Sequence, residues 1–445
     1  MSFYTKMKEK LTSFQIIILG FAGVILLGAL LLMLPVSSAS HEVTSFGTAL
    51  FTATSAVCVT GLVVVDTATY WSSFGQVVIL GMIQIGGLGV ITIAVFLSML
   101  TGRKIGLMQR QTMQNALSAP QMGGIVRLTR FILIASFFIE GVGALLLLPV
   151  FFPAYGLRGV WMSIFHSISA FCNAGFDLMG SHTGTFSSLT SFRGNGYVTV
   201  VVTLLIIIGG IGFITWNDLV TKKFRVKEYK MQTKVILTTT GILIFIPFVL
   251  FFFGEFERFE FKERLCQSFF QAVTPRTAGF NMAGLDDMTD SGKIVTMILM
   301  LIGGSPGSTA GGMKTTTVAI LFANSIAVFK KRENANYFGR RVDDCVVKNA
   351  SAILFMYVIL ATSSGFFISA IEHLPLEACM YESFSAIGTV GLSLGITPTL
   401  SAASLGILGL LMFFGRVGGL TIIYAAFSHK DMSTSKYPME SITVG

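Results

Sequence analysis

Residues 50–62 have the sequence LFTATSAVCVTGL, and three further stretches of the chain align with it without a gap. They are IFHSISAFCNAGF at 164–176, SFFQAVTPRTAGF at 268–280 and MYESFSAIGTVGL at 380–392. The twelfth column is glycine in all four, the second is aromatic, and the thirteenth is Leu or Phe. Successive glycines of the twelfth column are 114, 104 and 112 residues apart. A tandem period of this kind defines the architecture of the whole chain.

The sequence around these stretches is too apolar for a soluble protein. Of the 445 residues, 53% are hydrophobic and 12% charged, whereas a soluble domain has roughly a quarter charged residues. Most of eight apolar segments reach the ~20 residues that a helix needs to cross a bilayer; they lie at 14–33, 74–100, 131–152, 197–220, 235–253, 294–328, 350–371 and 405–427. The first is too long for the apolar region of a signal peptide, which has about 7–15 residues.

We therefore predict an all-α membrane protein built from four tandem membrane–pore–membrane repeats. Eight spanning helices and four re-entrant pore helices would surround one pseudo-fourfold pore. The expected repeats are residues 1–110, 111–225, 226–335 (with the intramembrane loop described below) and 336–445.

The basic residues indicate the topology. If the N-terminus is cytoplasmic, 22 of the 31 Lys and Arg residues fall in cytoplasmic segments, including Lys6, Lys8, Lys10, Arg103 and Lys104. This bias predicts that both termini are cytoplasmic. The net charge of +9 then follows from topology, and because the basic residues are dispersed among short loops, we expect no nucleic-acid partner.

Each thirteen-residue segment is too short to span the bilayer and ends in a small or polar tip. We expect a half-helix followed by extended backbone, which is tolerated at membrane depth only where it is buried in protein or lines water. Four helix C-termini would point partial negative charge at one axis, and the following carbonyls could replace the hydration shell of a cation. Glycine accepts positive φ and leaves the narrowest point open. The predicted filter residues are Val59, Thr60, Gly61, Asn173, Ala174, Gly175, Thr277, Ala278, Gly279, Thr389, Val390 and Gly391.

These four units resemble the membrane subunit of the Trk/Ktr/HKT family of potassium transporters, of the KtrB type. Glycine at all four filter positions is associated with potassium selectivity in that family. The resemblance implies a potassium-selective permeation subunit that holds potassium ions and no organic cofactor. It also implies a homodimer embedded in the lipid of the plasma membrane and a cytoplasmic RCK-type nucleotide-binding regulatory subunit, for which the basic loops at 222–234 and 330–348 are candidate docking sites.

The second apolar segment of the third repeat is interrupted from Gly303 to Thr317 by GGSPGSTAGGMKTTT. We expect a loop folded back in the middle of the membrane, just inside the filter; similar loops act as the gate in the family that the chain resembles. A nucleotide-binding P-loop would require G-x-x-x-x-G-K-[ST], but Met313 separates Gly312 from Lys314. The predicted gate residues are Gly303, Gly304, Ser305, Pro306, Gly307, Ser308, Thr309, Ala310, Gly311, Gly312, Lys314 and Arg416.

The other three repeats carry glycine pairs in IGGLGVIT (85–92), IGGIGFIT (208–215) and VGGLTIIY (417–424). We interpret these pairs as close helix packing and expect the break in the third repeat only.

Few charges lie inside the apolar segments. Lys314 and Arg416 should face the protein interior or water, and our hypothesis is that Arg416 donates hydrogen bonds to carbonyls and hydroxyls of the loop, holding it across the pore. A structural pair unrelated to gating is the alternative. Glu140 could be a buried partner for a basic group, and Arg276 is expected to pack behind the filter.

No nucleophile, paired carboxylate or metal spacing argues for an enzyme. The main alternative function is a secondary transporter that couples potassium uptake to sodium or protons, because broken helices bind substrates in such proteins. A membrane scaffold or sensor is a further alternative.

Overall fold

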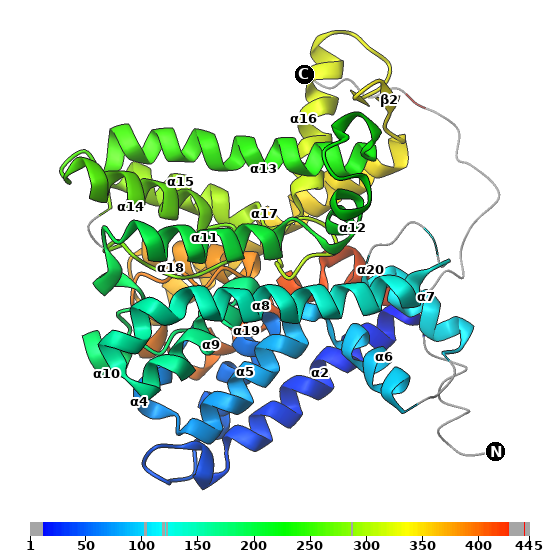
Figure 1. Cartoon of the computed structure of the whole chain (residues 1–445). Helices are drawn as coiled ribbons and strands as arrows, with labels where there is room; N and C mark the ends of the chain where they lie inside the picture. Colours follow the sequence, from blue (N-terminus) through cyan, green and yellow to red (C-terminus); the bar gives the residue numbers. More distant parts are fainter. Residues whose placement is uncertain are drawn as a thin grey trace.

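The computed structural model describes residues 12–101, 105–117, 121, 123–285, 288–426 and 440. Four successive units share one plan: a long helix, a short pore helix and a broken second span (Figure 1). This arrangement confirms the predicted fold class. The units comprise α2 (Ser13–Leu32), α3 (Phe46–Cys58), α5 (Ser73–Leu88) and α6 (Val90–Leu100); α8 (Ile125–Tyr155), α9 (Leu157–Phe171), α11 (Gly196–Gly210) and α12 (Phe213–Lys222); α13 (Met231–Leu250), α14 (Phe261–Val273), α15 (Asp290–Leu301) and α16 (Thr315–Phe329); and α17 (Asp344–Glu372), α18 (Leu376–Gly388), α19 (Ala402–Val417) and α20 (Gly419–Ala426).

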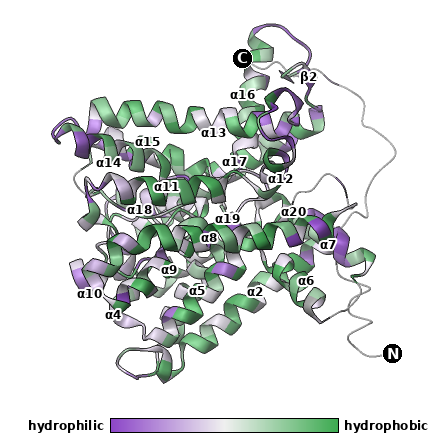
Figure 2. Cartoon of the chain, in the orientation of Figure 1, coloured by the Kyte–Doolittle hydropathy of each residue, from purple (hydrophilic) through white to green (hydrophobic). Residues whose placement is uncertain are grey.

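The first helix of each unit is long and apolar enough to cross a membrane, with α13 extended to Glu255 by a π-helical turn. Large apolar side chains project from these helices, and Leu27, Phe138, Phe245 and Phe355, one per unit, are each at least 60% exposed. Figure 2 shows hydrophobic residues along much of α2, α8 and α13. Such surfaces are stable when hydrocarbon surrounds them.

The second span is broken in every unit, by a bend in three and by a loop in the third, so the expectation of a break in the third repeat only is wrong. The helix axes turn by 96° between α5 and α6, by 98° between α11 and α12, and by 92° between α19 and α20. The residues at these bends are Gly89, Gly212 and Gly418, whose φ angles are +88°, +94° and +89°. Glycine adopts positive φ at no steric cost. In the third unit the loop at 302–314 separates α15 from α16.

Polar caps fix where each second span begins. The side chains of Ser72, Asn195, Thr289 and Ser401 accept hydrogen bonds from backbone N–H groups in the first turn of α5, α11, α15 and α19, respectively. These are the residue types that best satisfy the free N–H groups of a helix start. The same signal is therefore repeated four times.

The pore helices α3, α9, α14 and α18 lie inside the bundle. Each packs against the first helix of its own unit, and the C-terminal half of each is almost entirely buried. Small residues such as Ala53, Ser55, Ser169 and Ser383 let the surrounding helices approach closely.

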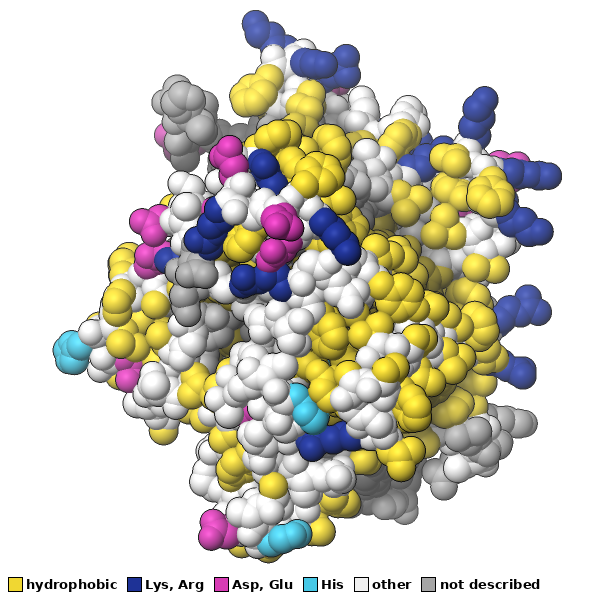
Figure 3. Space-filling model, turned by 60° about the vertical axis from the view of Figure 1, so that its left-hand side comes forward, with side chains coloured by type: hydrophobic (Ala, Val, Ile, Leu, Met, Phe, Trp, Pro, Cys, Tyr) yellow, Lys and Arg dark blue, Asp and Glu magenta, His cyan; other side chains and the backbone are white. Residues whose placement is uncertain are grey.

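Short elements lie between these helices. Within the first and second units they are α4 (Thr67–Tyr70) and α10 (Gly180–Thr183). Between units they are α7 (Leu107–Ala116) and an antiparallel hairpin of β1 (Asn336–Tyr337) and β2 (Arg340–Arg341). In Figure 3, apolar side chains form a broad patch, and Lys and Arg project along the right-hand edge.

The topology prediction rests partly on residues that lie outside the described part of the chain. These are Lys6, Lys8, Lys10, Arg103 and Lys104.

Candidate functional site

An unusual backbone conformation occurs at or just beyond the C-terminus of each pore helix, at the same repeat position. Val59, Asn173, Thr277 and Thr389 occupy the tenth column, and their φ angles are +57°, +58°, +70° and +52°. Three of them are β-branched, a type for which positive φ is an outlier. Strain of this kind persists only where the surrounding structure enforces it, and it is concentrated at functional sites.

Two residues later, the four glycines of the twelfth column form a closed ring. A Cβ atom on Gly61 would lie 2.6 Å from the carbonyl oxygen of Ala174, and one on Gly175 would lie 2.8 Å from that of Ala278. A Cβ on Gly279 would collide with the carbonyl oxygen of Val390, and one on Gly391 with that of Thr60. Each unit thus contacts the next, and the fourth returns to the first. All four φ angles are positive, between +69° and +96°, so only glycine fits this ring without strain.

Hydroxyl groups hold the ring from behind, and the sequence analysis did not single them out. The backbone N–H of Gly61 donates to Ser55 Oγ (3.1 Å), and that of Gly391 donates to Ser385 Oγ (3.0 Å). In the other two units the hydroxyl donates to the carbonyl after the glycine: Ser169 to Phe176 (2.7 Å) and Thr274 to Phe280 (2.6 Å). The sequence signal that could have identified these hydroxyls is the serine in the sixth column of three repeats.

An outer cavity of about 160 Å³ opens onto the ring and is lined by all four glycines. Asp66 and Asp177 also line it. Asp66 caps the N-terminus of α4: its carboxylate accepts a hydrogen bond from the backbone N–H of Ala68 (3.0 Å). The same carboxylate accepts a hydrogen bond from the backbone N–H of Phe186 in the second unit (2.9 Å). Desolvation raises the pKa of the Asp177 carboxyl, which lies outside the membrane-spanning helices, to about 7; the N–H of Met179 lowers this pKa and Asp66 raises it further.

The loop of the third unit lies directly beneath the ring. The hydroxyl of Thr309 donates to the carbonyl of Phe171 at the end of α9 (3.0 Å), and a Cβ on Gly311 would collide with the side chain of Thr389. Backbone N–H groups of Ser305 and Gly312 donate to Gly210 (2.9 Å) and Gly415 (3.2 Å). The loop therefore satisfies carbonyls that the broken helices α11 and α19 leave free.

The structure shows which glycines of the broken spans are equivalent. Gly86, Gly209 and Gly415 are equivalent, because a Cβ on each would collide with the carbonyl of the eighth column of its own pore helix, at Val57, Phe171 and Ile387. Gly418 then corresponds to the bend glycines of the first two units, and Arg416 occupies the position of Gly87 and Gly210.

Arg416 connects the loop to the first unit. Its Nη1 donates to the carbonyl of Thr309, and its Nη2 donates to those of Gly86 and Gly87, the latter at 3.0 Å. All these acceptors are carbonyls; none of the loop hydroxyls in the described chain bonds Arg416. Lys314 stays within the loop, donating from Nζ to the carbonyl of Ala310 (2.8 Å).

An inner cavity of about 240 Å³ lies on the other side of the loop. Loop residues Gly307, Ser308 and Gly312 line it, together with Lys314 and Arg416. The two charged groups thus face a cavity rather than hydrocarbon, as a charge at membrane depth requires. The loop separates this cavity from the ring.

Two other charged residues lie beside the site. Glu140 receives hydrogen bonds from Gln84 Nε2 at Oε1 (2.8 Å) and Oε2 (3.1 Å), and Cys172 Sγ lies 3.9 Å from Oε1. No ion pair of the described residues includes Glu140, so the structure gives it polar partners, Gln84 and Cys172, where a basic partner was considered. Arg276 is 5% exposed, and its Nη2 lies 3.4 Å from Thr240 Oγ1.

Comparison with known proteins places this geometry in a family. A family model described as "TrkH: Cation transport protein" matches residues 5–436. The chain belongs to this family. TrkH-family relatives include the potassium/sodium uptake protein NtpJ of Enterococcus hirae, 41% identical over 99% of both chains. The Ktr system potassium uptake protein B of Bacillus subtilis is 39% identical over 97% of this chain and 96% of its own.

The fold is also that of a solved TrkH-family structure. The potassium transporter TrkH from Vibrio parahaemolyticus superposes with a TM-score of 0.72, covering 92% of this chain and 83% of that one at 18% identity. This likeness shows the fold. The family model and the Bacillus relative show a multi-pass membrane protein of the cation transport class.

Proposed function

We propose that this chain is the potassium-selective permeation subunit of a potassium uptake system. The observation that carries the proposal is the closed ring of Gly61, Gly175, Gly279 and Gly391, in which a carbonyl lies beside each glycine. Carbonyl oxygens around an axis can replace the water that surrounds a cation. The names of the Enterococcus and Bacillus relatives, which specify potassium/sodium and potassium uptake, support the choice of ion.

In this proposal the four predicted triplets ending in the ring glycines form the filter, and each repeat supplies one. The proposed repeat boundaries stay at 1–110, 111–225, 226–335 and 336–445. Potassium is the transported ion, and no organic cofactor is needed in this chain. The function is transport and involves no chemical conversion.

We further propose that the loop from Gly303 to Gly312 is the gate. It lies between the ring and the inner cavity, and Arg416 bonds it to the first unit. Because a guanidinium bridges two units here, its removal should free the loop while the ring stays intact.

The decisive experiment measures potassium and sodium flux into proteoliposomes that contain the parent chain or Gly61→Ser. The parent should conduct potassium in preference to sodium, and the serine variant should lose that preference because its Cβ would lie 2.6 Å from the Ala174 oxygen. Equal ratios in parent and variant would contradict the filter.

The second candidate function is a transporter that couples potassium uptake to sodium or protons. The bends at Gly89, Gly212 and Gly418 favour it, because coupled transporters place binding sites at broken helices. A reversal potential that follows potassium alone supports the pore; one that shifts with a second ion supports coupling.

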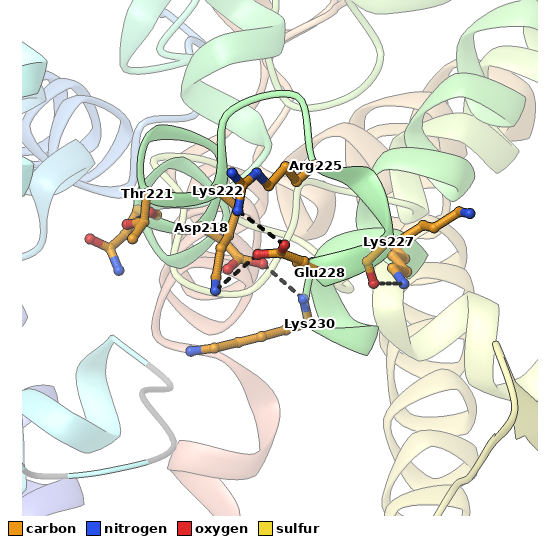
Figure 4. A network of polar contacts seen from close by, with 9 residues as sticks. Asp218, Thr221, Lys222, Arg225, Lys227, Glu228 and Lys230 are labelled. Carbon is orange, nitrogen blue, oxygen red and sulfur yellow. Dashed lines mark hydrogen bonds and ion pairs between the residues drawn. The ribbon is translucent and has the colours of Figure 1, made fainter.

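The proposed setting is the plasma membrane, with both termini in the cytoplasm and a homodimer in the lipid. A regulatory subunit with RCK-type nucleotide-binding domains would dock on the basic loops. One of these loops is ordered: Glu228 pairs with Lys222 (3.5 Å) and Arg225 (3.4 Å), and Lys230 N donates to Asp218 Oδ2 (2.9 Å) (Figure 4). The exposed Lys and Arg side chains of this loop could form ion pairs with acidic residues on the surface of the regulatory subunit.

A further inference from the structure

A groove runs between α13 and α16 of the third unit, away from the ring and the loop. The two helices pack against each other, and the cavity between them is about 230 Å³. Its walls are mainly apolar and include Val235 and Ile242 of α13 and Phe322 and Ile326 of α16. Phe322 is 65% exposed and Ile242 is 50% exposed, so the groove is open to its surroundings.

One end of the groove is polar. Arg332, Asn334 and Asn336, which follow α16, line this end. Within the described chain, the Arg332 guanidinium forms no hydrogen bond or ion pair, in contrast to Arg341, whose Nη2 lies 3.2 Å from Asp344 Oδ2. No acidic residue lines the groove.

These two features fit a molecule with a long apolar chain and an anionic head. The groove wall on α13 extends from Val235 to Ile242, which is roughly 10 Å of helix and matches part of an acyl chain. A free guanidinium beside amide groups is suited to phosphate, because its planar donor fork matches phosphate oxygens. Exposed Lys330 and Lys331 next to Arg332 add positive potential.

We propose that this groove binds an anionic phospholipid of the cytoplasmic leaflet. The acyl chain lies against Ile242 and Phe322, and the phosphate is bound by Arg332 with Asn334 and Asn336. The leaflet rests on the topology proposed above, but the recognition of the head group does not. A second copy of this chain would place its own basic residues against the basic end of the groove, which is unfavourable, whereas an anionic lipid complements the charge there.

The test uses tryptophan fluorescence in reconstituted vesicles. Phe322→Trp places a fluorophore in the groove at an exposed position that tolerates the change. Vesicles contain brominated phosphatidylglycerol or brominated phosphatidylcholine at equal mole fraction, and the signal of the three native tryptophans, measured in the parent, is subtracted. We expect stronger quenching by phosphatidylglycerol.

The matched variants separate a site from general surface charge. Arg332→Gln should lower the preference for phosphatidylglycerol about fivefold, the effect of one basic contact with an anionic leaflet. Arg340→Gln, an equal change of charge in the hairpin that follows Arg332 but outside the groove, should leave this preference unchanged. Soluble glycerol phosphate should not compete, because it lacks the acyl chain.

Three results would overturn the proposal. Equal quenching by both lipids would mean that the groove contacts hydrocarbon without recognising a head group. Absence of quenching by either would mean that protein covers it. If Arg332→Gln and Arg340→Gln lowered the preference for phosphatidylglycerol equally, that preference would come from the overall positive charge of the surface and not from a site in the groove. None of these changes touches the ring, so the potassium-to-sodium flux ratio serves as an independent check of the proposed function.

Discussion

The four repeats are alike at the ring of glycines and differ from one another at the level of the helix bends just beneath it. At the ring, every unit contributes a strained tenth-column residue and a glycine of positive φ. At the bends, the units diverge: the first two have Gly87 and Gly210 where the fourth has Arg416, and the third inserts a loop. Equivalent carbonyls around an axis can coordinate a dehydrated ion evenly, whereas a loop that closes the path has to come from one unit. Under the proposed function, symmetry is therefore kept where the ion would bind and lost where the loop would close the path.

The largest effect should come from breaking the ring itself. Gly279→Ala adds a Cβ that would collide with the Val390 carbonyl, at a φ of +78°. We expect the potassium-to-sodium flux ratio to fall by about tenfold or more, since tenfold corresponds to a loss of only ~1.4 kcal/mol in differential binding. Gly81→Ala is the matched control, because a Cβ there meets nothing within 4 Å. A parent-like ratio in Gly279→Ala would contradict the account.

At the level of the bends, the expected change is in rate rather than selectivity. Arg416→Ala removes the hydrogen bonds to Thr309, Gly86 and Gly87, and hydrogen bonds to charged groups contribute about 1.5–3 kcal/mol each. Potassium flux should rise several-fold with an unchanged flux ratio. Arg416→Lys, which keeps the charge but loses the planar fork, should give an intermediate flux. An altered ratio would place Arg416 in the filter instead, and unchanged flux would remove it from the gate.

The outer cavity should give a smaller, pH-dependent effect. Because the pKa of Asp177 is raised to about 7, its carboxyl is mostly ionised at pH 8 and mostly neutral at pH 6. The half-saturating potassium concentration should rise about threefold to fivefold as pH falls, because one unit charge at about 4 Å contributes about 1 kcal/mol across a water-filled cavity.

Asp177→Asn should show the high value at both pH values, and flux titrations with potassium measure it. Glu257→Gln, an exposed acid on the outer loop, removes an equal charge away from the cavity and should keep the parental pH dependence. A pH dependence that survives in Asp177→Asn would exclude this carboxyl as its source.

The smallest change concerns the support of the ring. Ser55→Ala leaves the N–H of Gly61 without its acceptor at 3.1 Å, a cost of about 1–3 kcal/mol for a buried donor. We expect a modest fall in the flux ratio, smaller than that in Gly279→Ala. Ser98→Ala is the control, because Ser98 is half-buried and its hydroxyl bonds the Ala94 carbonyl of its own helix. Equal ratios in the two serine variants would show that the Ser55 hydroxyl does not position the ring.

The same contrast explains what could be predicted from sequence. The fold and the candidate filter follow from columns shared by four repeats, because similar local sequence produces the same half-helix and the same αL turn in each. The bends at Gly89 and Gly418 were missed because a glycine pair is equally compatible with helix packing. The partner of Glu140 could not be predicted, because its contact with Gln84 joins helices of different units and no repeat encodes it.

The most direct test of the central claim is to locate the ion. A structure determined with Tl⁺ in place of potassium should show anomalous density on the axis, between the carbonyl oxygens of Thr60, Ala174, Ala278 and Val390. Density there would establish that the glycine ring binds the cation. An empty ring, with Tl⁺ bound only elsewhere, would contradict the account.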